Sequence, residues 1–362
     1  MTPLGARIAR QIQATGPISV SDYMAMCLFD PADGYYTTRE PFGEHGDFTT
    51  APEISQMFGE LIAIWLYQTW DALGRPTPLT VAEIGPGRGT LMKDMLRTFE
   101  RLDPSFTGAI TVALIETSPQ LTEVQKATLS QTKATPSWHT TIETLPDAPL
   151  LIVGNELFDA IPIRQFVRTE SGWRERMVAL DSQGQLAFFS GAGSLDPSLL
   201  PADACNAASG AIVELAPART AMMTAIAVHI AAKGGAALFP DYGYTAPGVA
   251  DTLQAVRRHR YENVLANPGE ADLTAHVDFA ALAAAANNQK LSTHLTTQGE
   301  FLLAMGLLER AGSLGAHADE TGRDEIRAAV ERLAAPQGMG ELFKILAVSP
   351  PGVSLPHIRS VN

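Results

Sequence analysis

The chain has 362 residues, of which 46% are hydrophobic and 18% are charged, a composition typical of a water-soluble globular protein. Its length allows one core with insertions or a second lobe. The net charge of −13 argues against nucleic acid as the main partner, because a phosphate backbone requires a basic protein surface.

Cysteine usage and hydropathy bear on where the protein works. Cys27 and Cys205 are far apart and lack metal-ligand spacing, so we expect reduced thiols and no metal site. No apolar run has the length of a membrane-spanning helix, and the first residues lack the apolar core of an export signal. We therefore expect a cytoplasmic protein, in preference to one of the mitochondrial matrix, without membrane insertion.

The first part of the chain predicts helices and loops. Apolar residues with helical spacing predict a helix close to the N-terminus, and Ser21 or Asp22 is the expected cap of a second one. A third helix is expected to begin at Pro52 and Glu53, because proline suits the first helical turn and an acid complements the helix dipole there. Residues 1–75 are expected to form an N-terminal helical cap with a lid.

From residue 79 onward, buried strands alternate with helices, which is typical of a parallel α/β sheet. The expected strands are residues 79–84, 110–115, 133–138, 150–154, 236–240, 290–296 and 343–348. The expected helices of the second half are residues 218–232, 277–287, 299–311 and 321–334. Residues 161–190 interrupt this alternation with a pattern typical of antiparallel strands. The sequence thus predicts a core of residues 76–160 and 211–362 with an inserted antiparallel segment at 161–210.

The most informative stretch joins the first expected strand to the helix that follows it. Its residues at the turn are Glu83, Gly85, Pro86, Gly87 and Gly89. Three glycines at alternate positions let the backbone come close to a ligand, although a purely structural turn is the alternative. The spacing differs from the dinucleotide fingerprint, because Thr90 replaces its third glycine. Glu83 would oppose a pyrophosphate and attract an ammonium group, so we favour S-adenosylmethionine as the ligand.

The next expected strand ends at a second acid, Glu116. In a doubly wound sheet, an acid at this strand end receives the ribose hydroxyls of an adenosine. The alternative for Glu116 alone is a solvated acid before the helix that begins near Pro119. Trp138, at the end of the third strand, is a candidate for the adenine contact, with a core role as the alternative. His139 is more consistent with a surface histidine than with a catalytic base.

The fourth expected strand is followed by Asn155, Glu156 and Asp159. An amide and two carboxylates directly after a buried strand are costly unless a ligand or another group pairs with them. Amine and amide methyltransferases often place such residues beside the transferred methyl group. A helix cap with acids in its first turn explains Asn155 and Glu156 equally well, so both interpretations stay open.

Stretches along nearly the whole chain resemble the MidA family of S-adenosylmethionine-dependent methyltransferases. They are GPI (16–18), GYY (34–36), GDFTTAPEISQ (46–56), EIGPGRGTL (83–91), NELFDA (155–160), DYG (241–243), DLTAHVDF (272–279), TQ (297–298) and MGELFK (339–344). The resemblance implies a class I methyltransferase, an α/β fold with a Rossmann-like doubly wound sheet, an N-terminal helical cap and an inserted β/helical region. The family includes a mitochondrial assembly factor that dimethylates an arginine on a subunit of respiratory complex I. The resemblance therefore implies a protein substrate with an accessible arginine.

Such a substrate agrees with the acids of the chain. A guanidinium is planar and cationic and pairs bidentately with carboxylates. Methyl transfer to it needs a carboxylate that orients it and a route for the lost proton. We assign the clamp to Glu53, Glu156 and Asp159, and we place Asn155 beside the methyl group. For Glu53 the alternative is an ordinary helix start.

Further residues and other functions stay open at this point. Asp47 and Gln56 are expected to line a lid, with Asp47 also counted among the cofactor-binding residues. Asp241 and Asp278 are the next candidates for the clamp. The rival functions are a methyltransferase for a small molecule or another residue type, and a largely non-catalytic complex I assembly chaperone. A homodimer is also left open.

Overall fold

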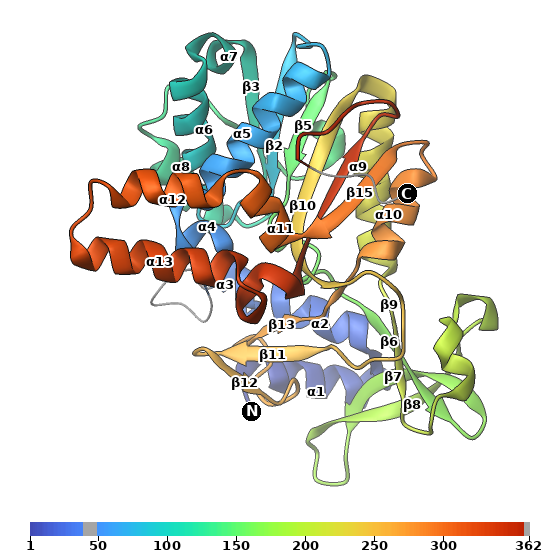
Figure 1. The fold of residues 1–362 in the computed structure, drawn as a ribbon. Coiled ribbons are helices and arrows are strands. Elements are labelled where there is room, and N and C mark those ends of the chain that lie inside the picture. Colours follow the sequence, from blue (N-terminus) through green and yellow to red (C-terminus); the bar gives the residue numbers. More distant parts are fainter. Residues whose placement is uncertain (39–48, 358–362) are drawn as a thin grey trace. The chain divides into compact units, whose positions relative to one another are not determined.

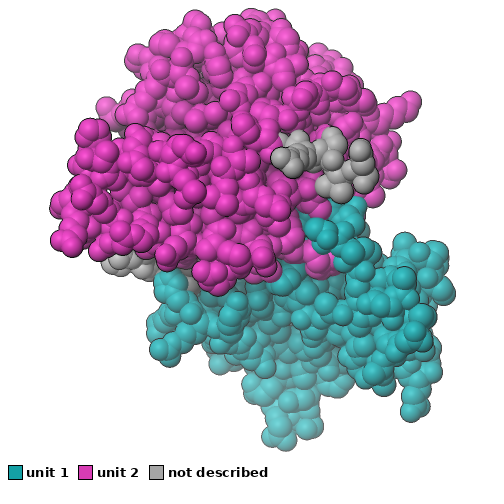
Figure 2. Space-filling model, in the orientation of Figure 1, with its two compact units in different colours: residues 1–48, 158–221, 245–280 teal, residues 49–157, 222–244, 281–362 magenta. Residues whose placement is uncertain are grey.

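The computed structural model describes residues 1–38 and 49–357, and it divides the chain into two compact units (Figure 2). The first unit consists of Met1–Phe48, Phe158–Ala221 and Thr245–Ala280. The second consists of Thr49–Leu157, Met222–Tyr244 and Ala281–Asn362. Each unit is assembled from three separate stretches of the chain. The domain limits expected from the sequence stay a prediction.

The first unit combines short helices with antiparallel sheets. Its helices are α1 (Pro3–Thr15), α2 (Val20–Phe29) and α3 (Tyr35–Thr38). One sheet has the order β1 (Ile18–Ser19), β7 (Gly172–Leu180), β6 (Arg164–Thr169) and β9 (Ile212–Leu215), and β8 (Leu186–Ser194) also pairs with β7. Another has the order β12 (Arg260–Glu262), β11 (Gln254–Arg257) and β13 (Asp272–Thr274), and β14 (Val277–Asp278) follows in the chain. The antiparallel strands expected within residues 161–190 are thus present as β6 and β7.

Side-chain caps explain where the first two helices begin. Thr2 accepts a hydrogen bond from the Gly5 N–H at 3.0 Å, which satisfies an N–H group at the start of α1. Ser19 accepts one from the Asp22 N–H at 3.0 Å, so the cap of α2 is Ser19. The expected cap at Ser21 or Asp22 is wrong, because both residues already lie inside the helix. The apolar faces of α1 and α2 pack together in one buried cluster.

The second unit is built on a mostly parallel sheet (Figure 1). Its strand order is β15 (Ser292–Thr297), β16 (Phe343–Ser349), β10 (Gly235–Tyr244), β5 (Leu150–Val153), β2 (Leu79–Ile84), β3 (Ile110–Ile115) and β4 (Ser137–His139). The pairs from β10 to β4 are parallel, whereas β16 is antiparallel to both β10 and β15. The predicted α/β sheet is therefore confirmed. Its third strand is displaced, because the expected residues 133–138 pair with β3 only from Ser137 onward.

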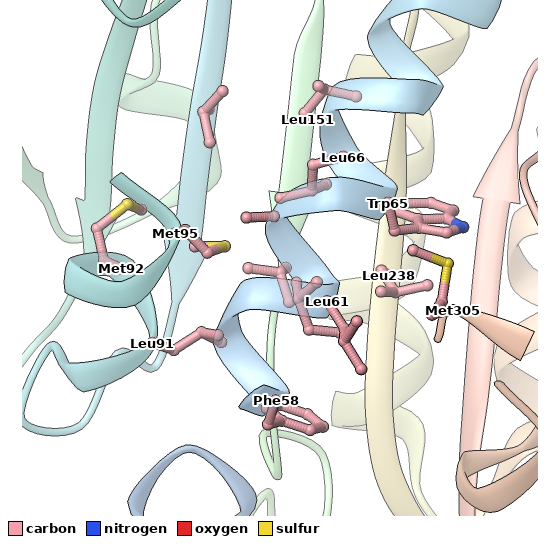
Figure 3. Close-up of a cluster of buried hydrophobic side chains, with 14 of the residues drawn as sticks. Phe58, Leu61, Trp65, Leu66, Leu91, Met92, Met95, Leu151, Leu238 and Met305 are labelled. Carbon is pink, nitrogen blue, oxygen red and sulfur yellow. The ribbon is translucent and has the colours of Figure 1, made fainter. Parts of the chain in front are cut away.

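Helices cover this sheet and bury its apolar residues. They are α4 (Ala51–Ile54), α5 (Gln56–Ala72), α6 (Thr90–Leu102), α7 (Pro104–Ala109), α8 (Pro119–Leu129), α9 (Pro217–Lys233), α10 (Phe279–Asn287), α11 (Gln298–Ala304), α12 (Leu307–Gly315) and α13 (Glu320–Ala334). Figure 3 shows Leu61 and Trp65 of α5 near Leu238 of the sheet, and Phe58 and Leu151 belong to the same buried cluster. Burying such side chains stabilises the fold by about 1.5–3 kcal/mol each. The packing of α5 on the sheet therefore also holds α4, which directly precedes it in the chain.

The order of the strands places a binding crevice. From β2 the chain moves outward to β3 and β4, then returns to β5 on the other side of β2 and continues to β10. Right-handed crossovers in opposite directions put α6 and α9 on opposite faces of the sheet. The loops after β2 and β5 consequently diverge at the carboxyl ends of two neighbouring strands. Such a switch point is where open α/β sheets bind ligands.

Two expected helices are divided in the structure. The helix expected from Pro52 ends at Ile54, because Ser55 is extended with φ −162°, and α5 begins with Gln56. The Ser55 hydroxyl accepts the Met57 N–H at 3.2 Å, so the break has its own cap. The helix expected at residues 299–311 is divided at Gly306, whose φ of +93° favours glycine.

A buried ion-pair network joins α5, α6 and α12. Glu60 is 5% exposed and accepts two hydrogen bonds from Arg310, at 2.6 and 2.9 Å, and one from Arg97 at 3.3 Å. Arg97 also pairs with Asp94 at 2.9 Å. Burial raises the pKa of Asp94 to about 6, although the Arg97 charge opposes the rise. Glu60 is therefore the carboxylate that Arg310 and Arg97 share.

We expect the Glu60→Gln protein to lose about 1.5–3 kcal/mol of unfolding free energy, because two partly exposed arginines lose their charge-assisted hydrogen bonds to a buried carboxylate. Urea denaturation measures this loss. Glu123→Gln is the matched control, since Glu123 forms an exposed pair with Lys126 at 2.7 Å and exposed pairs contribute less than about 1 kcal/mol. A loss no larger than that of the control would show that the network is not stabilising.

Candidate active site

The turn between β2 and α6 has the backbone that the glycines predict. Gly85, Gly87 and Gly89 all have positive φ, at 65°, 52° and 81°. Residues other than glycine rarely adopt these backbone angles, and β-branched residues do so only at a high cost in energy. The Gly85 N–H donates to the Ile115 carbonyl at 3.1 Å, and the Gly89 N–H donates to the Pro86 carbonyl at 2.7 Å. These bonds fix a tight turn at the N-terminus of α6.

Glu83 lies beneath this turn as the fifth residue of β2. It is 3% exposed, and burial raises its pKa well above the usual range, partly opposed by a hydrogen bond from the Met92 N–H. Its Oε2 has no hydrogen-bond partner among residues 1–38 and 49–357. A buried acceptor without a partner is costly, so a donor supplied by a ligand would stabilise it. An ammonium group is such a donor.

Glu116 directly follows β3, and its carboxylate accepts several hydrogen bonds. Its Oε1 accepts the N–H groups of Thr117 and Ser118, both at 2.8 Å, and its Oε2 accepts Gln125 Nε2 at 3.0 Å. The residue is partly buried, which raises its pKa above the usual range against the effect of these hydrogen bonds. Ser118 caps α8, so Glu116 is not the solvated helix-starting acid of the alternative interpretation.

Trp138 and an additional residue, Gln125, complete this side of the site. Trp138 Nε1 donates to Gln125 Oε1 at 3.0 Å, and Lys126 Nζ lies 5.7 Å from the centre of the Trp138 ring. Gln125 is fully buried on α8 and was not expected in the site, because a glutamine within a mixed helix resembles a surface residue. Nothing in the local pattern distinguishes it.

The loop after β5 holds Asn155 and Glu156. Glu156 has φ +49°, an unusual value for a residue with a side chain, and its N–H donates to the Pro240 carbonyl at 2.9 Å. Glu156 Oε1 accepts the Ala51 N–H and Asn155 Nδ2, both at 3.1 Å. Asn155 Oδ1 is buried without a partner among the residues that the structure describes. Residues 155–163 contain no helix, so the interpretation of Asn155 as a helix cap is wrong.

Glu53 connects α4 to the glycine turn. Its Oε1 accepts the Thr90 hydroxyl at 2.5 Å, at the first residue of α6. Together with the Ala51–Glu156 hydrogen bond, this contact ties the short helix α4 to the loops after both β2 and β5. Glu53 and Gln56 are also ordinary first-turn residues of α4 and α5, so their helical role is present as well.

The other residues considered from the sequence differ in their position in the fold and in their hydrogen-bond partners. Asp159 belongs to the first unit, where its carbonyl accepts the Ala275 N–H at 3.1 Å and Arg219 Nη2 at 2.9 Å. Asp241, in the second unit, is fully buried and accepts the Tyr242 N–H at 2.9 Å. Both ring nitrogens of His139 lie within hydrogen-bond distance of hydroxyl groups. Asp278 lies in β14, and Asp47 lies outside the described residues.

The crevice thus offers groups that fit an adenosyl amino acid. Glu83 in β2 and Asn155 in the loop after the neighbouring strand β5 each present a buried oxygen without a partner among the described residues. Glu116 keeps acceptor capacity on Oε2 beside its single bond from Gln125. Glycine backbone at positive φ leaves room for close approach at the turn between them. Ammonium, ribose hydroxyl and adenine contacts all have residues that match them.

This sheet order, the glycine turn and the acid after β3 define a class I S-adenosylmethionine-dependent methyltransferase. Residues 61–297 match the model of a family described as S-adenosyl-L-methionine-dependent methyltransferases. The chain belongs to this family.

Relatives cover nearly the whole chain. The mitochondrial protein arginine methyltransferase NDUFAF7 of Mus musculus is 36% identical, across 99% of this chain and 86% of its own length. The Homo sapiens protein of the same name is also 36% identical, across 99% and 85%. A crystal structure from Burkholderia thailandensis with bound S-adenosyl-homocysteine is 28% identical and has a TM-score of 0.81, covering 99% of this chain and 95% of that one.

The expected cofactor is therefore confirmed: the protein is an enzyme that uses S-adenosylmethionine. The relatives also confirm the resemblance to the MidA family. Across residues 1–38 and 49–357, no helix combines the length and the apolar character needed to span a bilayer.

Proposed function

We propose that this enzyme methylates an arginine of a protein partner. The observation that carries the proposal is the 36% identity, across 99% of the chain, to relatives named protein arginine methyltransferase. The acidic balance of the chain and the acids after β5 and in α4 support the same substrate, because a guanidinium is cationic.

Each site residue has a role in this proposal. Bound S-adenosylmethionine supplies an electrophilic methyl group on a sulfonium. Glu83 and Asn155 would hold its amino acid end, Glu116 its ribose and Trp138 its adenine. Glu156, held by the Ala51 N–H, orients the guanidinium and accepts the proton that the arginine nitrogen loses as it is methylated. Glu53 and Asp159 remain further members of the proposed clamp, and Asp47 remains part of the proposed lid.

The partner and the location belong to the same proposal. The family resemblance suggests a subunit of respiratory complex I or its bacterial counterpart as the substrate protein. A cytoplasmic site of action and a homodimer are proposed with it. Cell fractionation followed by immunodetection tests the first, and light scattering of the purified protein tests the second.

Mass spectrometry tests the arginine assignment directly. Proteomes of cells with and without the gene are compared for methyl-arginine, with the Glu156→Gln gene returned as a matched control. We expect one or a few methyl-arginine peptides to disappear and to return only with the wild-type gene. The purified protein should then methylate that peptide, and a lysine in place of the arginine should abolish methylation.

The same comparison separates the rival functions. Intact methyl-arginine together with a lost methylated metabolite, or with loss at another residue type, would replace arginine as the substrate. Unchanged methylation of every class, together with a complex I assembly defect that the Glu156→Gln gene also corrects, would favour the non-catalytic chaperone.

A further inference from the structure

Gln125 is a buried polar residue whose side-chain amide makes all of its hydrogen bonds to residues of the candidate cofactor site. It lies on α8 and is 0% exposed. Its Nε2 donates to the Gly87 carbonyl at 2.8 Å and to Glu116 Oε2 at 3.0 Å. Its Oε1 accepts Trp138 Nε1 at 3.0 Å. Both amide hydrogens and the carbonyl oxygen are thus engaged.

The three partners of this amide lie in or directly after three different strands. Gly87 lies after β2, Glu116 after β3, and Trp138 in β4. These segments carry or adjoin the residues to which the proposed site assigns the amino acid, ribose and adenine portions of the cofactor. α8 also packs directly on the turn, since a Cβ at Gly89 would lie 3.6 Å from Gln125 Cα. One side chain therefore links the segments that carry Gly87, Glu116 and Trp138.

We propose that Gln125 is a positioning residue that fixes Glu116, the Gly87 peptide and Trp138 in the geometry that binds S-adenosylmethionine. This inference concerns the cofactor alone and does not depend on the proposed arginine substrate.

The chemistry of the amide explains why glutamine suits this place. A carboxylate has about four acceptor sites, and Glu116 uses three of them on Thr117, Ser118 and Gln125. The remaining site on Oε2 is left for a ribose hydroxyl. Gln125 orients that oxygen without adding a charge, so the carboxylate keeps its full strength as an acceptor. A lysine or arginine at this position would neutralise it.

The test compares cofactor binding by Gln125→Met and wild-type protein. Methionine keeps the length and apolar contacts of the side chain but supplies no strong donor or acceptor. We expect the Kd for S-adenosyl-homocysteine, measured by calorimetry, to rise about 10- to 100-fold, since three partly buried partners each lose a bond to a buried amide. Gln120→Met, at an exposed position of the same helix, should leave the Kd unchanged.

A second measurement separates positioning from a general structural role. Because Gln125 acts in part through Glu116, the double variant Gln125→Met/Glu116→Gln should lose less affinity than the sum of the two single losses. The wild-type preference for adenosine over 2′-deoxyadenosine should also shrink in Gln125→Met, and the response of Trp138 fluorescence to ligand should change. A merely structural residue would lower the melting temperature and leave this preference intact.

The outcomes decide the proposal in either direction. Wild-type affinity in Gln125→Met, or fully additive effects with Glu116→Gln, would overturn it. If Gln125→Met does not fold, Gln125→Asn replaces it, because asparagine keeps the amide but withdraws it by one methylene. That variant should show the same loss of affinity and of ribose preference, and unchanged binding by it would overturn the proposal.

Discussion

Replacement of Glu156 by glutamine is expected to nearly abolish turnover while the cofactor still binds. Glutamine keeps the shape and an oxygen that can accept the Ala51 N–H, so the loop after β5 should stay in place. What disappears is the negative charge that pairs with the guanidinium. Loss of a desolvated charge-assisted contact costs about 2–5 kcal/mol, which corresponds to roughly thirty- to several-thousand-fold in kcat.

Single-turnover kinetics with the peptide identified by mass spectrometry measure this effect. Glu325→Gln, at an exposed position of α13, is the matched control and should retain wild-type rates. Calorimetry with S-adenosyl-homocysteine should give a Kd within about threefold of wild type for both variants, because the cofactor contacts are unchanged. If the Glu156→Gln enzyme methylates at the wild-type rate, Glu156 does not bind the guanidinium. Asp241 and Asp278 would then be the next candidates for this role.

The sequence predicts the central strands well because their signal is local. Residues 79–84 and 110–115 are apolar runs bounded by turn residues, and both became strands with these limits. The acid that ends the second run, Glu116, occupies the expected strand end for the same reason. In a doubly wound sheet, chain order and strand ends together place such residues at one edge.

Features that depend on distant partners were not predictable. The two-residue strand β1 pairs with β7 about 160 positions later, as in Ile18 with Val178, and two residues carry no periodicity. Ser55 interrupts a helix without any glycine or proline to mark the break. Gln125 contacts Gly87 across 38 positions, so its role follows from the packing of α8. The hydrophobic pattern of the sequence identifies helices and strands. The pairing of β1 with β7, the break at Ser55 and the contacts of Gln125 depend instead on tertiary packing.

The burial of Glu83 is a related case. Its position after an apolar run identifies it as an acid beside the glycine turn, but the run does not reveal a fully buried carboxyl with a raised pKa. The pKa rises because the side chain shares the sheet face packed beneath α5 and α6, where solvent is excluded. The charge state of such a residue is set by the fold.

Replacement of Gly87 by valine is expected to abolish cofactor binding. Gly87 has φ +52°, and a β-branched residue is strongly disfavoured there. The Gly87 carbonyl is also held by Gln125, so a shift of this peptide would disturb the contacts of Glu116 and Trp138 as well. We expect the Kd for S-adenosyl-homocysteine to rise by at least roughly a hundredfold, equivalent to about 3 kcal/mol.

Gly74→Val is the matched control for backbone strain. Gly74 has φ +83° with nothing within 4 Å of an added Cβ, and it lies before β2, at the opposite end of that strand from the glycine turn. Both variants therefore carry a valine at positive φ within the same unit, but only one lies at the crevice. Circular dichroism should show both folded, and calorimetry should show binding only by Gly74→Val. Undiminished affinity of a folded Gly87→Val protein would place the cofactor away from this turn, because valine cannot keep the glycine backbone without strain.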